Sequence, residues 1–418
     1  MNIVNTINIF ILNFLILLPP GISVKNVLNG EKYQGNFKLG NEVLLTDKFA
    51  LIKNKNIALV TNNSGVISDG TFFVDELHKN ESIYLKKIFC PEHGFRGDDN
   101  NQDHTDINSN IPVISLYGNK NKPSSNDLED VEIIVYDIQD VAVRFYTYIN
   151  TMYYCMEAAL ENNKRIIICD RPIISCPDYV DGFLLDENFK SFVGMLNIPV
   201  SYGMTCGELA KYINSEYFNE GCDLVIAEMK NYSRDIDYSD LFLTWKKPSP
   251  NMYYPSTAVI YPGTCLLEGT NISEGRGTDY PFEYLGAPYC NSDLLKKELD
   301  SYNFIGVEFQ QISFIPVINQ NTNVTPKYNG ENCNGVQIKI LNKKIAEPFK
   351  IGIAVLISFK HLFSEFKWRK DNYIDKLSGT DELRKMIDKG KSYNDIISLY
   401  KSQIEEFNSK RKKFLLYK

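Results

Sequence analysis

The sequence predicts an α/β protein in which a parallel sheet with helices on both faces is followed by a smaller α+β domain. Between about residues 50 and 260, short runs rich in β-branched residues alternate with helical patterns. The runs are apolar at successive positions, which is typical of strands buried on both faces. Beyond residue 300 two strand patterns are followed only by helical ones. The 418 residues are also enough for two cores.

The first domain is predicted over residues 40–268. Its strands are expected at 56–62, 85–90, 131–138, 164–170 and 222–229. Its helices are expected at 71–80, 150–163 and 205–218. The last helix has Thr205 at its start and Glu208 three residues later, which is the pattern of a capping box. No G-x-G-x-x-G follows the first strand, so no dinucleotide is expected as a cofactor.

The second domain is predicted over residues 269–418. The segment 245–290, which spans the boundary, is crowded with Pro, Gly, Ser and Thr and is expected to be mostly ordered loop. Strands are expected at 307–317 and 334–341. A helix is expected at 345–363, and further helices between 380 and 410.

The N-terminus predicts export from the cytoplasm. An apolar stretch from Ile7 to Leu18 is too short to span a bilayer comfortably and is followed by two prolines. We therefore expect residues 1–23 to be a signal peptide and the mature protein to be secreted or extracytoplasmic, with no stable membrane span. A net charge of −7 and the lack of a long Lys/Arg run argue against nucleic acid as a partner. The nine cysteines form no C-x-x-C pair, and several lie inside apolar runs as small core residues.

Polar residues follow four of the predicted strands, at the point where each strand ends. Because the carboxyl ends of parallel strands meet at one edge of a sheet, these side chains are candidates to line one crevice. The set comprises Asn62, Glu92, His93, Asp137, Gln139, Asp140, Arg144 and Arg171. Each residue alone has a structural explanation, since polar residues at strand ends also cap helices and satisfy loop backbone.

This set predicts the cleavage of a glycosidic bond. If the fold holds Glu92 against Phe89, Phe95 and Tyr146, these apolar and aromatic neighbours would raise its pKa and suit it as a general acid. Asp137 or Asp140 would be the second carboxylate of such an enzyme. A metal site at His93 and these aspartates is disfavoured, because the chain has four histidines and no H-x-x-x-H pair. No metal or other cofactor is expected.

The segment 268–283 is the second candidate ligand-binding element. Its glycines allow a close approach of the backbone to a ligand, and its polar residues include Asn271, Glu274 and Arg276. An arginine in this position would bind a carboxylate through two parallel hydrogen bonds.

Several long motifs, in order along the chain, resemble the exo-β-N-acetylmuramidase family, formerly a family of unknown function. They include "PEHGFRG", "YDIQDVAVRFYTYINTMYYCMEAA", "WKKPSPNM" and "EGTNISEGRGTDYPFEYLGAP". The resemblance covers about residue 40 to the C-terminus. It implies a Rossmann-like catalytic domain, a smaller C-terminal domain that closes the cleft, and release of N-acetylmuramic acid from the non-reducing end of peptidoglycan fragments.

The resemblance also implies roles for particular residues. Glu92 of the P-E-H-G motif is the expected catalytic acid, with His93 beside it, and Arg96 of the same motif and Tyr146 are candidates to bind substrate. The lactyl carboxylate of the sugar needs a cationic partner, for which Arg276, Arg144 and Arg171 are the candidates in that order.

Two departures from the family pattern keep a second function open. Ile173 and Ile174 replace an Asn-Pro pair, and Tyr202 replaces a histidine that we include among the substrate-binding positions. The alternative is a non-catalytic protein that binds amino sugars or peptidoglycan. The mechanism is also open: the substrate's acetamido oxygen attacks the anomeric carbon, or Asp137 or Asp140 activates water.

Overall fold

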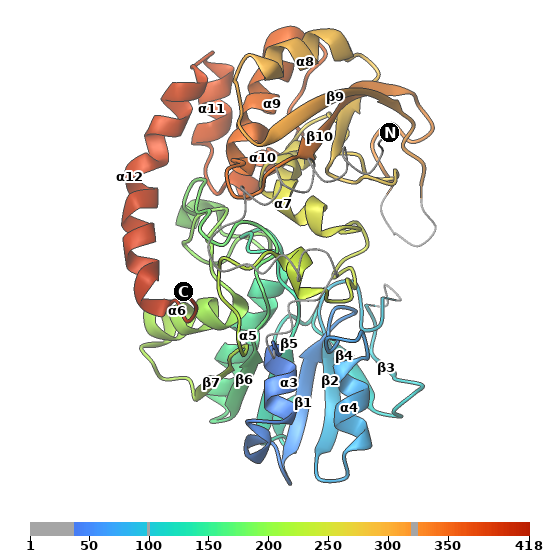
Figure 1. Ribbon diagram of the computed structural model, residues 1–418, viewed down its shortest axis with the longest axis vertical. Coiled ribbons are helices and arrows are strands. Elements are labelled where there is room, and N and C mark those ends of the chain that lie inside the picture. Colours follow the sequence, from blue (N-terminus) through green and yellow to red (C-terminus); the bar gives the residue numbers. More distant parts are fainter. Residues whose placement is uncertain (1–36, 98–100, 319–324) are drawn as a thin grey trace, which may run out of the picture.

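The computed structural model describes residues 37–97, 101–318 and 325–418 (Figure 1). The predicted signal peptide lies outside these residues. None of the helices in the described ranges is long and apolar enough to cross a membrane.

A seven-stranded sheet forms the first part of the chain. Its strands are β1 (Asn56–Thr61), β2 (Tyr84–Cys90), β3 (His104–Thr105), β4 (Pro112–Ser115), β5 (Ile133–Asp137), β6 (Arg165–Cys169) and β7 (Leu224–Ala227). Their order across the sheet is β3-β4-β2-β1-β5-β6-β7, and every pairing is parallel except that of β3 with β4. The five predicted strands are therefore confirmed, while β3 and β4 were missed because both are short.

The strands are buried on both faces, as the unalternating apolar runs predict. In β5, Ile134 and Tyr136 belong to the larger apolar core, whereas Ile133 and Val135 belong to a second, smaller core on the other face. The larger core includes residues of α5 (Tyr148–Glu161) and α6 (Cys206–Phe218). The smaller one includes residues of α3 (Gly40–Leu45) and α4 (Phe73–Lys79). Helices thus cover both faces, which confirms the predicted α/β class.

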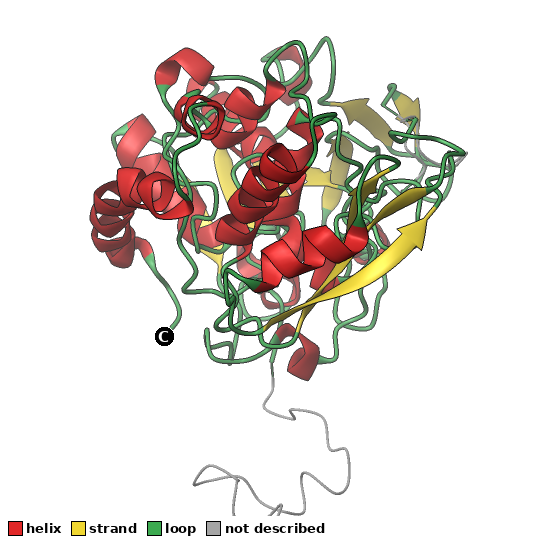
Figure 2. Cartoon of the chain, turned by 90° about the horizontal axis from the view of Figure 1, so that it is seen from above, coloured by secondary structure: helices red, strands yellow, loops and turns green. Residues whose placement is uncertain are grey.

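The second part contains a three-stranded antiparallel sheet and most of the remaining helices. The strands, in the order β8-β10-β9, are β8 (Tyr284–Ala287), β9 (Val307–Phe314) and β10 (Cys333–Ile340). The helices are α7 (Pro255–Thr264), α8 (Ser292–Asp300), α9 (Pro348–Leu362), α10 (Tyr373–Ser378), α11 (Glu382–Asp388) and α12 (Tyr393–Arg411). Helix α8 packs on the strands β9 and β10. These two long strands lie at the rim of the molecule when it is seen from above (Figure 2).

Six short 3-10 helices complete the secondary structure of the described residues. They are η2 (Phe49–Leu51), η3 (Asn126–Leu128), η4 (Glu187–Phe189), η5 (Tyr238–Leu241), η6 (Cys265–Gly269) and η7 (Lys412–Phe414).

The expectation of a mostly loop segment at 245–290 was wrong for its central part, which forms α7, η6 and β8. Pro255 occupies the first turn of α7, where a missing N–H costs nothing. Gly263 lies against α9, where a Cβ would come within 1.9 Å of the Pro348 carbonyl oxygen. The proline and glycine that resemble loop residues thus begin a helix and allow it to pack backbone to backbone on its neighbour.

The two parts of the molecule share one continuous apolar core. Tyr261 of α7 packs edge-on against Phe145 with ring centroids 5.5 Å apart, and Phe183 packs against Phe349 of α9 at 6.4 Å. Helix α12 then runs back along the molecule to α6 (Figure 1). All nine cysteines are free and eight of them are buried, as expected for core residues.

Candidate active site

A cavity of about 270 Å³ lies between the carboxyl edge of the large sheet and the second part of the chain. Its polar lining side chains are Glu92, His93, Thr147, Ser249, Asn251, Glu268 and Arg276. Its aromatic lining side chains are Tyr117, Phe145, Tyr146, Tyr148, Phe192, Tyr261, Phe282 and Tyr373. Both parts of the chain therefore contribute to one site that combines carboxylates, a guanidinium group and many rings.

Glu92 and His93 enter the cavity from a tight turn directly after β2. The turn has left-handed backbone at His93 (φ 73°) and at Gly94 (φ 75°). Its backbone is fixed by a hydrogen bond of 2.9 Å from the His93 N–H to the side-chain oxygen of Asn101. Left-handed conformation at a residue other than glycine costs free energy and concentrates at functional sites. The turn therefore presents an acid and an imidazole where the buried strand ends.

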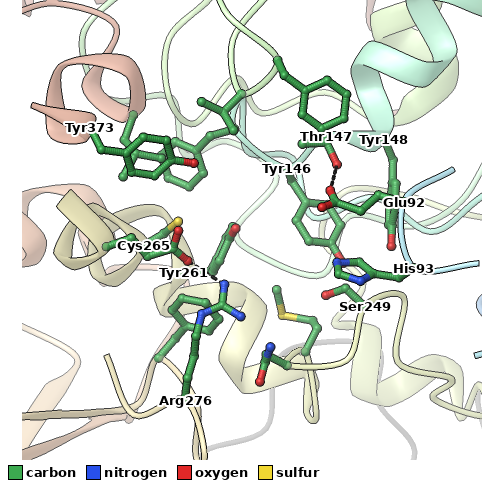
Figure 3. Close-up of a pocket in the computed structure, with 18 of the residues that line it drawn as sticks. Glu92, His93, Tyr146, Thr147, Tyr148, Ser249, Tyr261, Cys265, Arg276 and Tyr373 are labelled. Atoms are coloured by element: carbon green, nitrogen blue, oxygen red, sulfur yellow. Dashed lines mark hydrogen bonds and ion pairs between the residues drawn. The ribbon is translucent and has the colours of Figure 1, made fainter. Parts of the chain in front are cut away.

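The carboxylate of Glu92 is held by the start of α5. The Thr147 hydroxyl donates a hydrogen bond of 3.0 Å to Glu92 Oε2 (Figure 3). Thr147 is the N-cap residue of α5, yet its side chain makes no capping bond to its own helix. The hydroxyl thus orients the acid and leaves Oε1 without a contact to Thr147.

Three tyrosines form a packed floor beside the acid. Tyr146 contacts Tyr148 and Tyr261 edge to face, with ring centroids 4.9 and 5.7 Å away. Burial raises the pKa of Tyr146 and Tyr261 well above the ordinary value for a phenol. These hydroxyls are therefore neutral at physiological pH, and the floor offers apolar surface and uncharged polar groups to a ligand.

Arg276 lies across the cavity from the acid (Figure 3), and Glu268 lines the cavity beside it. The guanidinium donates to Glu268 at 2.6 Å, lies 3.4 Å from Glu274 and stacks on Phe282 at 4.9 Å. Burial alone would lower the pKa of Arg276, but Glu268 and Glu274 raise it. Lys327 binds Glu274 at 2.8 Å from the other side. Arg276 is therefore a fixed positive charge at the cavity surface.

Asp137 and Arg171 do not line this cavity, and they form a buried ion pair with each other. The Asp137 carboxylate accepts hydrogen bonds from Arg171 Nε at 2.7 Å and Nη2 at 2.8 Å. It also accepts one from Asn41 at 3.0 Å. Both members of the pair are buried. The pair joins the end of β5 to the end of β6 and to α3.

Asp140 and Tyr202 form a second buried pair away from the cavity. The Tyr202 hydroxyl donates to Asp140 Oδ2, and the backbone N–H of Ala142 donates to the same oxygen at 2.8 Å. Burial raises the pKa of Asp140 to about 6. The tyrosine that departs from the family pattern is thus a partner of a core aspartate.

The other predicted site residues hold loops in place rather than line the cavity. Arg144 donates to the carbonyl oxygens of Phe183 and Ile198 at 2.7 Å each. Three side-chain amides also donate hydrogen bonds to backbone carbonyl oxygens: Asn62 to Pro248, Gln139 to Asp140 and Pro172, and Asn271 to Glu365. Arg96 forms ion pairs with Asp75 and Asp106. Of the residues proposed from sequence, the structure brings together Glu92, His93, Tyr146 and Arg276, with Glu274 behind Arg276.

Sequence reasoning missed several residues of the lining. Thr147 and Tyr148 lie in the motif that supplied Tyr146, and Ser249 lies in "KPSPNM", so the family motifs contained a signal for them. Tyr117 and Phe192 lie in two further motifs of the resemblance, "IPVISLYG" and "SFVGMLNIPVSYGMTCGELA", so these residues also carried a signal. No group of three His, Cys, Asp or Glu side chains that could hold a metal ion occurs within the described parts of the chain.

Comparisons with known proteins agree with this architecture. Residues 57–256 match the family model described as the N-terminal part of the exo-β-N-acetylmuramidase NamZ, and residues 259–417 match the C-terminal part. The chain is 40% identical over 383 residues to the peptidoglycan β-N-acetylmuramidase NamZ of Bacillus subtilis strain 168. The aligned region covers 90% of this chain and 91% of that protein.

Two crystal structures of DUF1343 family proteins from Bacteroides fragilis also share the fold. One superimposes with a TM-score of 0.84 at 32% identity, over 91% of this chain and 99% of that one. The other has a TM-score of 0.76 at 33% identity, over 92% of this chain and 99% of that one. On these grounds, and in agreement with the motifs read from its sequence, the chain belongs to the NamZ exo-β-N-acetylmuramidase family.

Proposed function

We propose that the protein is an exo-acting glycoside hydrolase that releases N-acetylmuramic acid from the non-reducing end of peptidoglycan fragments. The observation that carries the proposal is Glu92, held by Thr147 at 3.0 Å in a cavity lined by aromatic rings. Membership of the family and the 40% identity to a peptidoglycan β-N-acetylmuramidase support the same substrate.

In this mechanism Glu92 donates its proton to the glycosidic oxygen while the bond from that oxygen to the anomeric carbon breaks. The leaving sugar departs with the proton as a free hydroxyl. In the route through the acetamido group, water then adds to the anomeric carbon and returns a proton to the Glu92 carboxylate. Two routes to the anomeric carbon remain: attack by the substrate's own acetamido oxygen, or direct attack by activated water. Because Asp137 and Asp140 do not line the cavity, we favour the substrate-assisted route.

Arg276 is the group that we assign to the lactyl carboxylate of N-acetylmuramic acid. It lies at the cavity surface opposite Glu92, and its planar guanidinium carries five N–H donors, more than its contact with Glu268 uses (Figure 3). A sugar whose carboxylate meets Arg276 would have its anomeric end directed toward the acid. This assignment predicts that the protein prefers a muramyl to a glucosaminyl residue.

The departures from the family pattern do not favour the alternative of a non-catalytic binding protein. Tyr202 is buried and bonds to Asp140, and Ile173 is 4% exposed. Neither belongs to the cavity lining. The residues that would perform catalysis are all present at the cavity, so hydrolysis remains the proposed function.

We also propose that the protein acts outside the cytoplasm. The apolar stretch from Ile7 to Leu18, followed by Pro19-Pro20, supports a signal peptide. The proposed substrate supports the same location, since peptidoglycan lies outside the cell membrane. Cell fractionation of the native host, with the N-terminus of the mature chain sequenced, tests this point.

The function is tested with two substrates, the disaccharide N-acetylmuramyl-β-1,4-N-acetylglucosamine and 4-nitrophenyl β-N-acetylmuramide. Wild-type protein is expected to hydrolyse both. Glu92→Gln should lose about 10²-fold or more in kcat on the disaccharide. It should lose less on the nitrophenyl glycoside, because nitrophenolate leaves without protonation. The exposed Glu129→Gln is the matched control. Folded wild-type protein that hydrolyses neither substrate would overturn the proposed function.

A further inference from the structure

Two aromatic side chains that line the cavity have no role in the chemistry above. The rings of Tyr117 and Phe192 pack against each other with centroids 5.7 Å apart and an angle of 59° between their planes. Both are half-buried and line the cavity. Among the described residues, neither belongs to the apolar cores of the fold. Aromatic surface that is outside the core and exposed to a cavity is available to a ligand.

The register of the sheet places Tyr117 beside the acid. Strands β2 and β4 are parallel neighbours, with Cys90 paired to Ser115. The pairing continues past the strand ends through a hydrogen bond of 2.8 Å from the Leu116 N–H to the Cys90 carbonyl. Glu92 and Tyr117 each follow this paired position by two residues. They therefore leave the same edge of the sheet side by side.

Phe192 is fixed by the same helix turn that holds the acid. The side-chain amide of Asn150, in the first turn of α5, donates to the Phe192 carbonyl oxygen. Thr147, just before that turn, donates to Glu92 at 3.0 Å. The distance between the acid and the aromatic pair is thus set by one rigid element.

The cavity is charged on one side of Glu92 and aromatic on the other, and this difference would orient a bound disaccharide. Arg276, with Glu268 bound to it, faces the acid from the second part of the chain (Figure 3). Tyr117 leaves the sheet edge beside the acid and carries the uncharged ring of Phe192 against it. A general acid in an exo-glycosidase meets the oxygen between two sugars. The charged sugar then lies toward Arg276, and the other sugar lies toward the aromatic pair.

We propose that Tyr117 and Phe192 form the subsite for the leaving sugar, a 2-acetamido hexosamine whose apolar C–H face packs against the rings. The proposal rests on the proposed function and adds the orientation of the substrate within the cavity. The leaving sugar is thereby held with its glycosidic oxygen at Glu92, so that the rings contribute to turnover of oligosaccharides rather than to recognition of the muramyl residue.

The test compares two substrates that differ only in the leaving group. One is the disaccharide N-acetylmuramyl-β-1,4-N-acetylglucosamine, and the other is β-N-acetylmuramyl fluoride, whose leaving group is a single atom. In Phe192→Ala and Tyr117→Ala, kcat/KM for the disaccharide should fall about tenfold or more, as expected for the loss of a buried aromatic surface. For the fluoride, kcat/KM of the same variants should change less than about twofold. Phe192→Leu keeps apolar bulk but removes the flat ring, and it should show the same selective loss. This variant keeps the test valid if the alanine variants fail to fold.

Tyr84→Ala is the control, because Tyr84 is 48% exposed at the other end of β2. Equal losses on the two substrates, or unchanged turnover of the disaccharide, would overturn the subsite. Wild-type protein that hydrolyses neither substrate would instead overturn the proposed function, so the two failures are distinguishable.

Discussion

At the residue scale, the proposed acid depends on a hydroxyl that sequence patterns would assign to helix capping. Thr147→Ala should lower kcat about 3- to 10-fold with little change in KM, because one hydrogen bond that orients Glu92 is lost while the cavity keeps its shape. Thr147→Ser should restore most of the activity. Steady-state kinetics on the disaccharide measure both. A rise in KM with unchanged kcat would show that Thr147 binds substrate instead, and the exposed Thr244→Ala is the control.

Arg276 is predicted to recognise the carboxylate of the substrate. Arg276→Lys keeps the positive charge between Glu268 and Glu274 but loses the planar pair of donors. The inhibition constant for free N-acetylmuramic acid should rise about tenfold, whereas that for N-acetylglucosamine should change little. Competition against the nitrophenyl substrate gives both constants. Equal weakening of the two sugars would mean that Arg276 only maintains the cavity wall.

The residues also show what the sequence can and cannot predict about a site. Polar side chains at strand ends do converge on one edge, but many of them pair with each other before any ligand arrives, as Asp137 does with Arg171. A sequence gives no separation between side chains, so it cannot distinguish a residue at the cavity from one beneath it. Glu92 was identifiable because its motif combines an acid, apolar neighbours and a turn after a buried strand.

At the element scale, the pair of Asp137 and Arg171 is predicted to join β5, β6 and α3 rather than to act on substrate. Arg171→Met should lower the free energy of unfolding by about 3–5 kcal/mol, because it leaves a buried carboxylate without its cation. The control is Arg165→Met, whose partner Asp223 is 56% exposed. That change should cost less than about 1 kcal/mol. Urea unfolding measures both, and similar small losses would contradict a structural role for the pair.

Strands with an uninterrupted apolar run were predictable from sequence, whereas a helix that contains Pro and Gly was not. Each of the five predicted strands of the large sheet formed, since an apolar run buried on both faces has few alternatives. Helix α7 was missed because Pro262 and Gly263 usually end helices. Its stability comes from close packing on α9 at Gly352, a tertiary contact that no local pattern records.

At the scale of the whole molecule, one apolar core joins the two parts of the chain. Inter-domain surfaces are usually polar enough to permit motion. Here the larger apolar core includes residues from Ala58 to Phe414 and crosses the boundary predicted after residue 268. The C-terminal tail also returns to the first part, where the Leu416 N–H donates to Glu208 at 2.9 Å.

This construction predicts a single cooperative unfolding transition, although chains of this length often unfold in stages. Tyr417 is the most sensitive probe, because its hydroxyl donates to the buried Asp170 at 2.7 Å and accepts from the Met229 N–H at 2.9 Å. Tyr417→Phe removes both bonds and should lower the free energy of unfolding by about 1–3 kcal/mol. In calorimetry the whole peak should move to lower temperature without splitting, whereas the exposed Tyr84→Phe should leave it in place. Two separate peaks in the wild type, or a shift confined to one of them, would mean that the parts unfold independently and that the cavity between them is free to open.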